Sequence, residues 1–125
     1  MGNSQQVSEA IVGQGILPLY YHADAEVSRE VLHAIYRAGI RAVEYTNRGE
    51  AALRNFSALI RLRNESMKDL LLGVGTVKTV EDARQYVAAG ADFLVSPGWI
   101  PAVADYAVAQ SVFYAPGCMT PSEII

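Results

Sequence analysis

A glutamate and an arginine at the end of one apolar run carry the side chains best suited to act together chemically. Glu44 lies within the run 42–46, and Arg48 follows two residues after its end. Burial raises the pKa of a carboxyl group, whereas a nearby guanidinium lowers it, and a proton shuttle works best near the working pH. A guanidinium also binds a carboxylate through two parallel hydrogen bonds. The pair therefore suits proton transfer and the binding of a carboxylate.

Both residues also have a purely structural interpretation. Ionised carboxylates are seldom buried without a partner, because their burial costs several kcal/mol. Glu44 can therefore be a paired structural carboxylate, with Arg41 or Arg48 as its partner. Arg48 can equally be a solvated loop residue. The residues by themselves leave both interpretations open.

Three further short motifs close other apolar runs, and a stretch of helical character follows each of them. They are Gly-Val-Gly-Thr-Val at 73–77, Ser-Pro-Gly at 96–98 and Pro-Gly-Cys-Met-Thr-Pro at 116–121. The carboxyl ends of parallel strands lie on one face of a sheet. We therefore expect these motifs to converge with Glu44 and Arg48 on one site.

Two residues of these motifs are candidate ligand contacts. The glycines around position 74 indicate close approach of a neighbouring strand or a ligand, so Thr76 can face a ligand or be an ordinary strand residue. Pro97 can have a functional role, although a turn between strand and helix explains it as well. We expect both to lie at the same end of the sheet.

The remaining reactive side chains give weaker signals. Lys78 follows an apolar run in a solvated loop, where an amine stays protonated and is a poor nucleophile. His22 and His33 are far apart and fit no zinc pattern, so surface or capping roles are expected. Cys118 is the single cysteine, so an intrachain disulfide is excluded. It has no neighbouring base in the sequence that would make it a nucleophile. No metal site is predicted.

Hydrophobic periodicity predicts alternating helices and strands. Helices are expected at about 4–13, from Asp24 or Ser28 to Gly39, 49–64, 79–90, 101–110 and from 120 onward, and strands at 16–21, 42–46, 70–77, 92–96 and 112–115. In the helix 49–64 the apolar stripe should face a sheet, while Arg63 and the neighbouring charged residues should face water. Short connections between alternating elements indicate a parallel sheet with right-handed crossovers.

Two architectures hold five parallel strands. One is an open doubly wound sheet of flavodoxin type, and the other is the first part of a (β/α)₈ TIM barrel. No glycine-rich phosphate loop follows the first strand, and the sequence reaches Ile125 in the opening turn of a helix. Both observations favour the barrel, with a leading helix and about five βα units in residues 1–125.

Composition restricts the classes of partner. The chain has 125 residues, of which 51% are hydrophobic and 18% charged, as in one globular domain. A net charge of −3 argues against nucleic acid as the main partner. No apolar run approaches the ~18 residues of a transmembrane helix, and no signal pattern is present. We therefore expect no membrane partner and a cytoplasmic protein.

Taken together, the motifs resemble those of the 2-keto-3-deoxy-6-phosphogluconate (KDPG) and 4-hydroxy-2-oxoglutarate (KHG) aldolases. The matching elements are Ile-Leu-Pro-Leu at 16–19, Glu-x-Thr-x-Arg at 44–48, and the three motifs that begin at 73, 96 and 116. Their order and spacing fit along nearly the whole chain. Each motif alone is weak evidence, but five in register are specific.

The resemblance implies a fold, a reaction and residue roles. Family members are TIM-barrel class I aldolases, usually trimeric, in which a lysine on the sixth strand forms a Schiff base with pyruvate and no cofactor or metal takes part. By this resemblance Glu44 is the general acid/base, partly through a bound water, and Arg48 binds the pyruvate carboxylate. Thr76 helps to place the substrate, and Pro97 shapes the pocket wall. The substrate is a small keto acid, namely pyruvate, KDPG or KHG.

The sequence departs from the family pattern in its lysines. It contains only Lys68 and Lys78, and neither falls in the family's lysine motif, which would lie beyond Ile125. We therefore expect the chain to be the N-terminal part of such an aldolase and to be inactive alone. The alternative is a non-catalytic flavodoxin-like module with Arg48 as an anion site, and a third possibility is another phosphate-binding (β/α)₈ enzyme.

Overall fold

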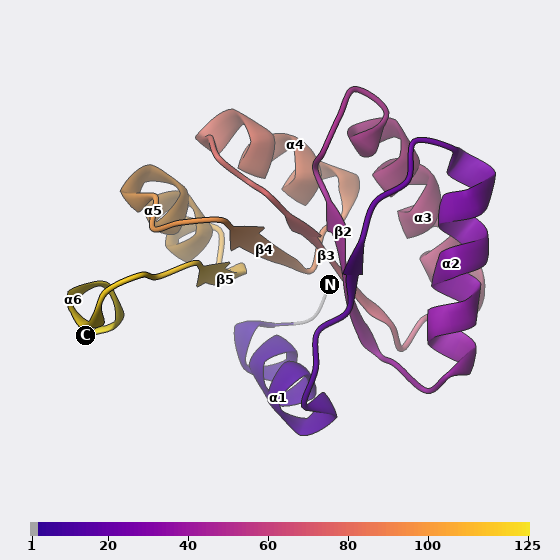
Figure 1. Cartoon of the computed structure of the whole chain (residues 1–125), viewed down its shortest axis with the longest axis horizontal. Coiled ribbons are helices and arrows are strands. Elements are labelled where there is room, and N and C mark those ends of the chain that lie inside the picture. Colours follow the sequence, from indigo (N-terminus) through magenta and orange to yellow (C-terminus); the bar gives the residue numbers. More distant parts are fainter. Residues whose placement is uncertain (1–2) are drawn as a thin grey trace.

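The computed structural model describes residues 3–125, in which helices and strands alternate without interruption (Figure 1). The helices are α1 (Ser4–Gln14), α2 (Ala25–Arg37), α3 (Ala52–Ser66), α4 (Val80–Ala89), α5 (Pro101–Ala109) and α6 (Pro121–Ile124). The strands are β1 (Leu19–Tyr20), β2 (Ala42–Thr46), β3 (Leu71–Gly75), β4 (Phe93–Ser96) and β5 (Phe113–Pro116). The predicted order of elements is confirmed.

The order of the strands in the sheet decides between the two architectures. All five strands are parallel and lie in the order β1-β2-β3-β4-β5, so each strand pairs with the next one along the chain. A flavodoxin-like sheet has the order 2-1-3-4-5 instead. The flavodoxin-like alternative is therefore wrong, and the five strands have the order of part of the wall of a TIM barrel.

The helices divide into a row and a separate leading helix. Helices α2, α3, α4 and α5 each contact the next along the sheet, while α1 lies apart from this row (Figure 1). The Gln14 side chain of α1 accepts hydrogen bonds from the backbone N–H groups of Arg41 and Ala42, and the Ser4 hydroxyl donates to the Ser111 carbonyl. Helix α1 therefore bridges the amino ends of β2 and β5.

The two faces of the sheet have different environments. Side chains such as Tyr45 and Val74 enter the large hydrophobic cluster that the helices α2 to α5 share. The alternate residues of β2, among them Glu44 and Thr46, point to the opposite, inner face. All five residues of β2 are buried. The position of a polar side chain in β2 is therefore fixed by the backbone of the sheet and by the residues packed around it.

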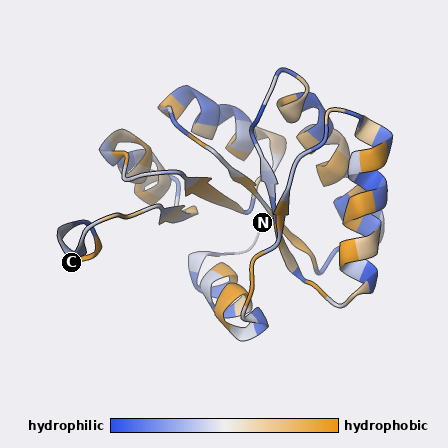
Figure 2. Cartoon of the chain, viewed as in Figure 1, coloured by the Kyte–Doolittle hydropathy of each residue, from blue (hydrophilic) through white to orange (hydrophobic). Residues whose placement is uncertain are grey.

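Capping residues fix the helix starts that the sequence predicted. The Asp24 carboxylate accepts hydrogen bonds from two N–H groups of α2 at 2.8 and 3.0 Å, and the Thr79 hydroxyl accepts one from Asp82 in α4 at 3.0 Å. Of the two caps proposed for α2, Asp24 is the one used, because Ser28 lies buried within the helix. Hydrophobic and hydrophilic residues alternate along α2 as on an amphipathic helix (Figure 2).

Some predicted boundaries were wrong. The first strand covers only Leu19–Tyr20 instead of 16–21, because Pro18 has no N–H to donate and only its carbonyl pairs with β2, at Glu44. The helix expected from Gly49 begins at Ala52, after a turn. In the described part of the chain no helix is long and apolar enough to cross a membrane.

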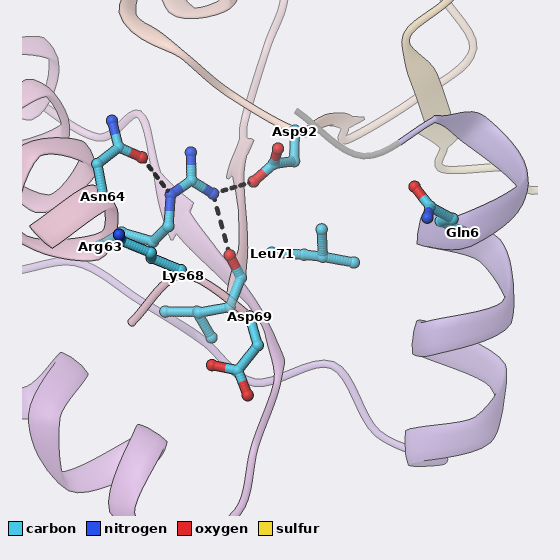
Figure 3. Close-up of a pocket in the computed structure, with 8 residues that line it drawn as sticks. Gln6, Arg63, Asn64, Lys68, Asp69, Leu71 and Asp92 are labelled. Atoms are coloured by element: carbon cyan, nitrogen blue, oxygen red, sulfur yellow. Dashed lines mark hydrogen bonds and ion pairs between the residues drawn. The ribbon is translucent and has the colours of Figure 1, made fainter. Parts of the chain in front are cut away.

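Arg63 does not face water, which corrects the prediction for this side chain. It is 8% exposed, and its guanidinium forms an ion pair with the buried Asp92 carboxylate (Figure 3). It also donates to the Leu70 carbonyl at 3.0 Å and to Asn64 at 2.8 Å. The helical period places Arg63 on the same face as the buried Phe56, and a buried carboxylate makes this burial possible.

Candidate active site

The four residues that the sequence singled out lie at the carboxyl end of the sheet. Glu44 is in β2, Arg48 follows β2, Thr76 follows β3 and Pro97 follows β4. Because these three strands are parallel neighbours, the sheet brings the segments together at one end. The residues differ in burial: Glu44 is buried, Thr76 is half-buried, and Arg48 and Pro97 are exposed.

The Glu44 carboxyl group lies directly against the backbone of β3. A Cβ atom built on Gly75 would stand 1.5 Å from the Glu44 Oε1 atom and 2.3 Å from its Cδ atom. Glu44 is 5% exposed, and its carboxylate makes no hydrogen bond within residues 3–125. The glycine at 75 therefore creates the space that the carboxyl group occupies. The close approach expected at this position involves a side chain of the neighbouring strand.

Burial and charge act in opposite directions on Glu44. Burial raises the pKa of the Glu44 carboxyl group, and the Arg48 guanidinium lowers it by a smaller amount, so the pKa lies above its usual range. Arg41 takes no part, because its Nε atom pairs with Asp69 at 2.9 Å. The interpretation of Glu44 as the partner of Arg41 is therefore wrong. A raised pKa brings a carboxyl group closer to the poise that proton transfer in both directions requires.

Thr76 occupies a strained turn at the end of β3. Its φ angle of 60° is in the left-handed region, which is unusual for a β-branched residue. The flanking backbone is fixed on both sides, since Asn47 N–H donates to the Gly75 carbonyl at 2.9 Å and Val77 N–H to Val95 at 3.0 Å. Such strain costs about 1–3 kcal/mol and is commonly found at functional sites.

Pro97 packs against the segment that follows β5. A Cβ atom on Gly117 would stand 2.5 Å from the Pro97 carbonyl oxygen, and the Gly117 N–H donates to Ser96 at 2.9 Å. The motifs 96–98 and 116–121 are therefore in contact, as their predicted convergence requires. Since Pro97 itself is exposed, its position fits a turn residue as well as a pocket wall.

The lysines lie outside the buried niche around Glu44. Lys78 is exposed in the loop after β3, and its amine makes no ion pair or hydrogen bond within the described residues. Lys68 is also exposed and lies at the opposite end of the sheet, where it lines a polar cavity of about 630 Å³ with Arg63 and Asp92 (Figure 3). Neither amine is desolvated as a Schiff-base nucleophile requires.

The histidine and cysteine side chains have local roles. His22 is exposed, its Nδ1 atom accepts a hydrogen bond from Asp24 N–H at 3.0 Å, and its carbonyl accepts from Tyr45 and Asn55. Cys118 is free and half-buried. Within residues 3–125 no three His, Cys, Asp or Glu side chains are grouped so that they could hold a metal ion.

Two residues of the inner face belong to the quoted motifs but were assigned no role of their own from the sequence. Thr46 is 1% exposed and its hydroxyl has no hydrogen-bond partner within residues 3–125, on the same face of β2 as Glu44. Gly75 was noted, but its function of admitting the Glu44 carboxyl group was not. The two-residue period of β2 was a signal for Thr46, whereas the contact across β3 depends on strand register.

Comparison with known proteins gives a consistent result. Residues 7–125 match the family model described as KDPG and KHG aldolase. The chain is 35% identical over 118 residues to the 2-dehydro-3-deoxy-phosphogluconate aldolase of Treponema pallidum. These aligned residues cover 94% of this chain and 54% of that protein. It is 26% identical over its full length to the KHG/KDPG aldolase of Escherichia coli, of which it covers 57%. The chain thus spans about half the length of the curated relatives it matches.

Solved structures agree with these relatives. The KDPG aldolase of Legionella pneumophila, solved with pyruvate captured as a covalent carbinolamine intermediate, is 29% identical with a TM-score of 0.79, over 86% of this chain and 50% of that one. The Zymomonas mobilis aldolase, at 22% identity, shares the fold with a TM-score of 0.84 over 97% of this chain and 56% of that one. On the family match, the chain belongs to the KDPG and KHG aldolases.

Proposed function

We propose that this chain supplies the proton-transfer and carboxylate-binding part of a class I aldolase. The reaction is the reversible cleavage of a 2-keto-4-hydroxy acid, KDPG or KHG, to pyruvate and an aldehyde. The names of its relatives support this substrate class. The observation that carries the proposal is the buried Glu44 carboxyl group, which has no hydrogen-bond partner within residues 3–125 and occupies a niche at Gly75.

Glu44 transfers the proton in this proposal. Cleavage of the bond between C3 and C4 of the keto acid requires a base that takes the proton from the C4 hydroxyl group, and addition requires the reverse. Burial raises the pKa of the Glu44 carboxyl group, which makes it a better proton donor–acceptor for both directions than an exposed glutamate. Its position on a strand keeps the carboxyl group in a fixed place relative to the sheet.

The other three residues bind and orient the substrate. Arg48, exposed at the end of β2, binds the carboxylate of pyruvate through its planar guanidinium. Thr76 directs its polar groups toward the substrate from a strained turn, and Pro97 forms part of the pocket wall. The charge of Arg48 also limits how far burial raises the pKa of Glu44.

The Schiff-base amine comes from outside the residues described. The reaction needs a neutral amine that adds to the ketone carbon with loss of water, and the resulting protonated imine takes up the electron pair when the carbon–carbon bond breaks. Lys68 and Lys78 are both exposed and unsuited to this role. We therefore propose that the 125-residue chain alone is inactive, that no metal or cofactor takes part, and that the complete enzyme is a cytoplasmic homotrimer.

Trapping with borohydride tests the amine. The purified 125-residue chain is incubated with pyruvate and borohydride, and its intact mass is measured. We expect the unmodified mass of about 13.5 kDa, because neither lysine forms an imine. A reduced pyruvate adduct on this chain would mean that Lys68 or Lys78 is the nucleophile, and would contradict the proposal.

A chimaera tests the function of Glu44. Residues 3–125 replace the matching part of the Treponema pallidum relative, and the release of pyruvate from KDPG and KHG is measured. We expect activity that falls roughly 10²- to 10⁴-fold in Glu44→Gln, the range for loss of a general acid/base. Glu65→Gln, at an exposed position of α3, is the matched control and should change nothing. An active chimaera that is unaffected by Glu44→Gln would refute the assignment.

A further inference from the structure

The segment that carries Arg48 is held by a buried tyrosine of α4. The Tyr86 hydroxyl donates a hydrogen bond to the Oδ1 atom of Asn47, the residue before Arg48, at 2.9 Å. Tyr86 is 1% exposed, and its ring meets the Phe56 ring of α3 edge-on, with the two centroids 5.2 Å apart. A phenylalanine would fill the same space against Phe56, so the hydroxyl adds only the contact with Asn47. Tyr86 therefore ties α4 to the end of β2.

Asn47 is also bound by the backbone of β3. Its N–H group donates to the Gly75 carbonyl at 2.9 Å, and this carbonyl belongs to the peptide bond that leads into Thr76. Asn47 thus accepts a hydrogen bond from α4 through its side chain and donates one to β3 through its backbone. The two segments proposed to bind the substrate, around Arg48 and around Thr76, are therefore joined through this residue.

The residue after Arg48 is restrained as well. A Cβ atom built on Gly49 would stand 3.0 Å from the Tyr21 hydroxyl oxygen, and the Gly49 carbonyl accepts a hydrogen bond from the Ala52 N–H at 3.0 Å. The exposed Arg48 side chain makes no hydrogen bond or ion pair within residues 3–125. The backbone of Arg48 is therefore held at both neighbouring residues, while its guanidinium can bind a ligand.

We infer that Tyr86 and Asn47 are positioning residues, whose hydrogen bond holds the backbone of Arg48 in place beside the Thr76 turn. The inference rests on the proposed function in that Arg48 binds the substrate carboxylate. A flexible arginine side chain can reach a carboxylate from a fixed Cα atom, but a mobile backbone adds freedom that binding must remove. Loss of the Tyr86 hydroxyl should therefore weaken substrate binding and leave proton transfer by Glu44 unchanged.

Amide hydrogen exchange of the 125-residue chain, followed for each residue by NMR, tests the anchoring. Tyr86→Phe keeps the ring and removes only the hydroxyl, and we expect the Asn47 amide to exchange roughly three- to tenfold faster relative to the paired amides of β3. Tyr20→Phe is the matched control, because the hydroxyl that it removes donates to the Ser28 carbonyl in α2 at 2.7 Å instead. This control should leave the ratio unchanged. If Asn47 loses no more protection than β3 does in Tyr86→Phe, the hydroxyl has a merely structural role and the inference is wrong.

Steady-state kinetics of the chimaera with the Treponema pallidum relative tests what the anchoring does for Arg48. In Tyr86→Phe we expect KM for the keto acid that is cleaved to rise roughly three- to tenfold, with kcat unchanged to within about twofold. The double variant Asn47→Ala/Tyr86→Phe should match Asn47→Ala, because both substitutions break the same hydrogen bond.

The two experiments separate the inference from the proposed function. An active chimaera in which Tyr86→Phe leaves KM unchanged, or lowers kcat alone, overturns the inference. A chimaera without activity contradicts the proposed function instead, and faster exchange at Asn47 in Tyr86→Phe then still supports the inference that this hydrogen bond holds the segment of Arg48.

Discussion

The contact between Glu44 and Gly75 predicts that the two positions are energetically coupled. In Gly75→Ala the new methyl group would stand 1.5 Å from the Glu44 Oε1 atom, and all three nearest atoms belong to Glu44. Ordinary contacts begin near 3.4 Å, so the carboxyl group must leave its niche. Glu44 is 5% exposed and cannot move without disturbing the inner face. Overpacking of this kind costs about 1–3 kcal/mol.

Truncation of the Glu44 side chain should abolish the destabilisation that Gly75→Ala causes. In a Glu44→Ala background the same methyl group enters the space that the carboxyl group has left. Gly75 does not have a positive φ angle, so alanine is tolerated there and stabilises by about 0.4–1 kcal/mol through the unfolded chain. The coupling energy between the two substitutions is therefore roughly 1.5–4 kcal/mol.

Urea denaturation of the four proteins of this double-mutant cycle measures the coupling. Gly13→Ala in α1 is the control, because nothing lies within 4 Å of its new methyl group and it should be neutral or stabilising. If Gly75→Ala destabilises the protein equally with and without the Glu44 side chain, the carboxyl group does not occupy the niche. Glu44 would then not be a buried proton-transfer group at this position.

Three further predictions concern charge and strain. Because burial raises the pKa of Glu44, the folded chain binds more protons than the unfolded chain above the pKa of an ordinary glutamate, and the free energy of unfolding falls there as pH rises. Urea denaturation at several pH values should show a weaker dependence of this free energy on pH in Glu44→Gln. Arg63→Met removes the guanidinium that pairs with the buried Asp92 carboxylate, which keeps its hydrogen bond from the Leu72 N–H, and should lower the free energy of unfolding by about 3–5 kcal/mol in urea denaturation. The double variant Arg63→Met/Asp92→Asn should recover part of this loss, and the absence of any recovery would contradict the prediction. Thr76→Asn should raise the unfolding free energy by about 0.5–1 kcal/mol, because asparagine tolerates the left-handed region, and a lower thermal midpoint would contradict the strain at Thr76.

Local signals in the sequence predicted the elements well where the chemistry is local. Asp24 and Thr79 cap helices because their side chains reach N–H groups two or three residues away. Gly39 follows α2 with a φ of 97°, which glycine adopts without strain. Pro18 shortened β1 more than the apolar pattern indicated, since pairing requires N–H groups and the pattern records only hydropathy.

Contacts between distant parts of the chain were out of reach of the sequence. Arg63 was placed in water because charged residues usually are, and its buried partner Asp92 is 29 positions away. The niche at Gly75 depends on the register of β2 against β3, which is set by the whole sheet. The family resemblance indicated Glu44 and Arg48 as a pair, but it did not show that one is buried and the other exposed.

This difference in burial suits the tasks proposed for the two residues. Proton transfer requires that the donor and the acceptor lie within hydrogen-bond distance. A proton-transfer group is therefore best held in a fixed position, and the fully buried strand β2 fixes the position of Glu44. Carboxylate capture tolerates more movement, because a flexible side chain with a planar guanidinium can meet its ligand from the loop. If Arg48 were buried beside Glu44 instead, the two would form a closed ion pair, and the pKa of the carboxyl group would fall. The exposed position of Arg48 therefore fits the proton-transfer role proposed for Glu44.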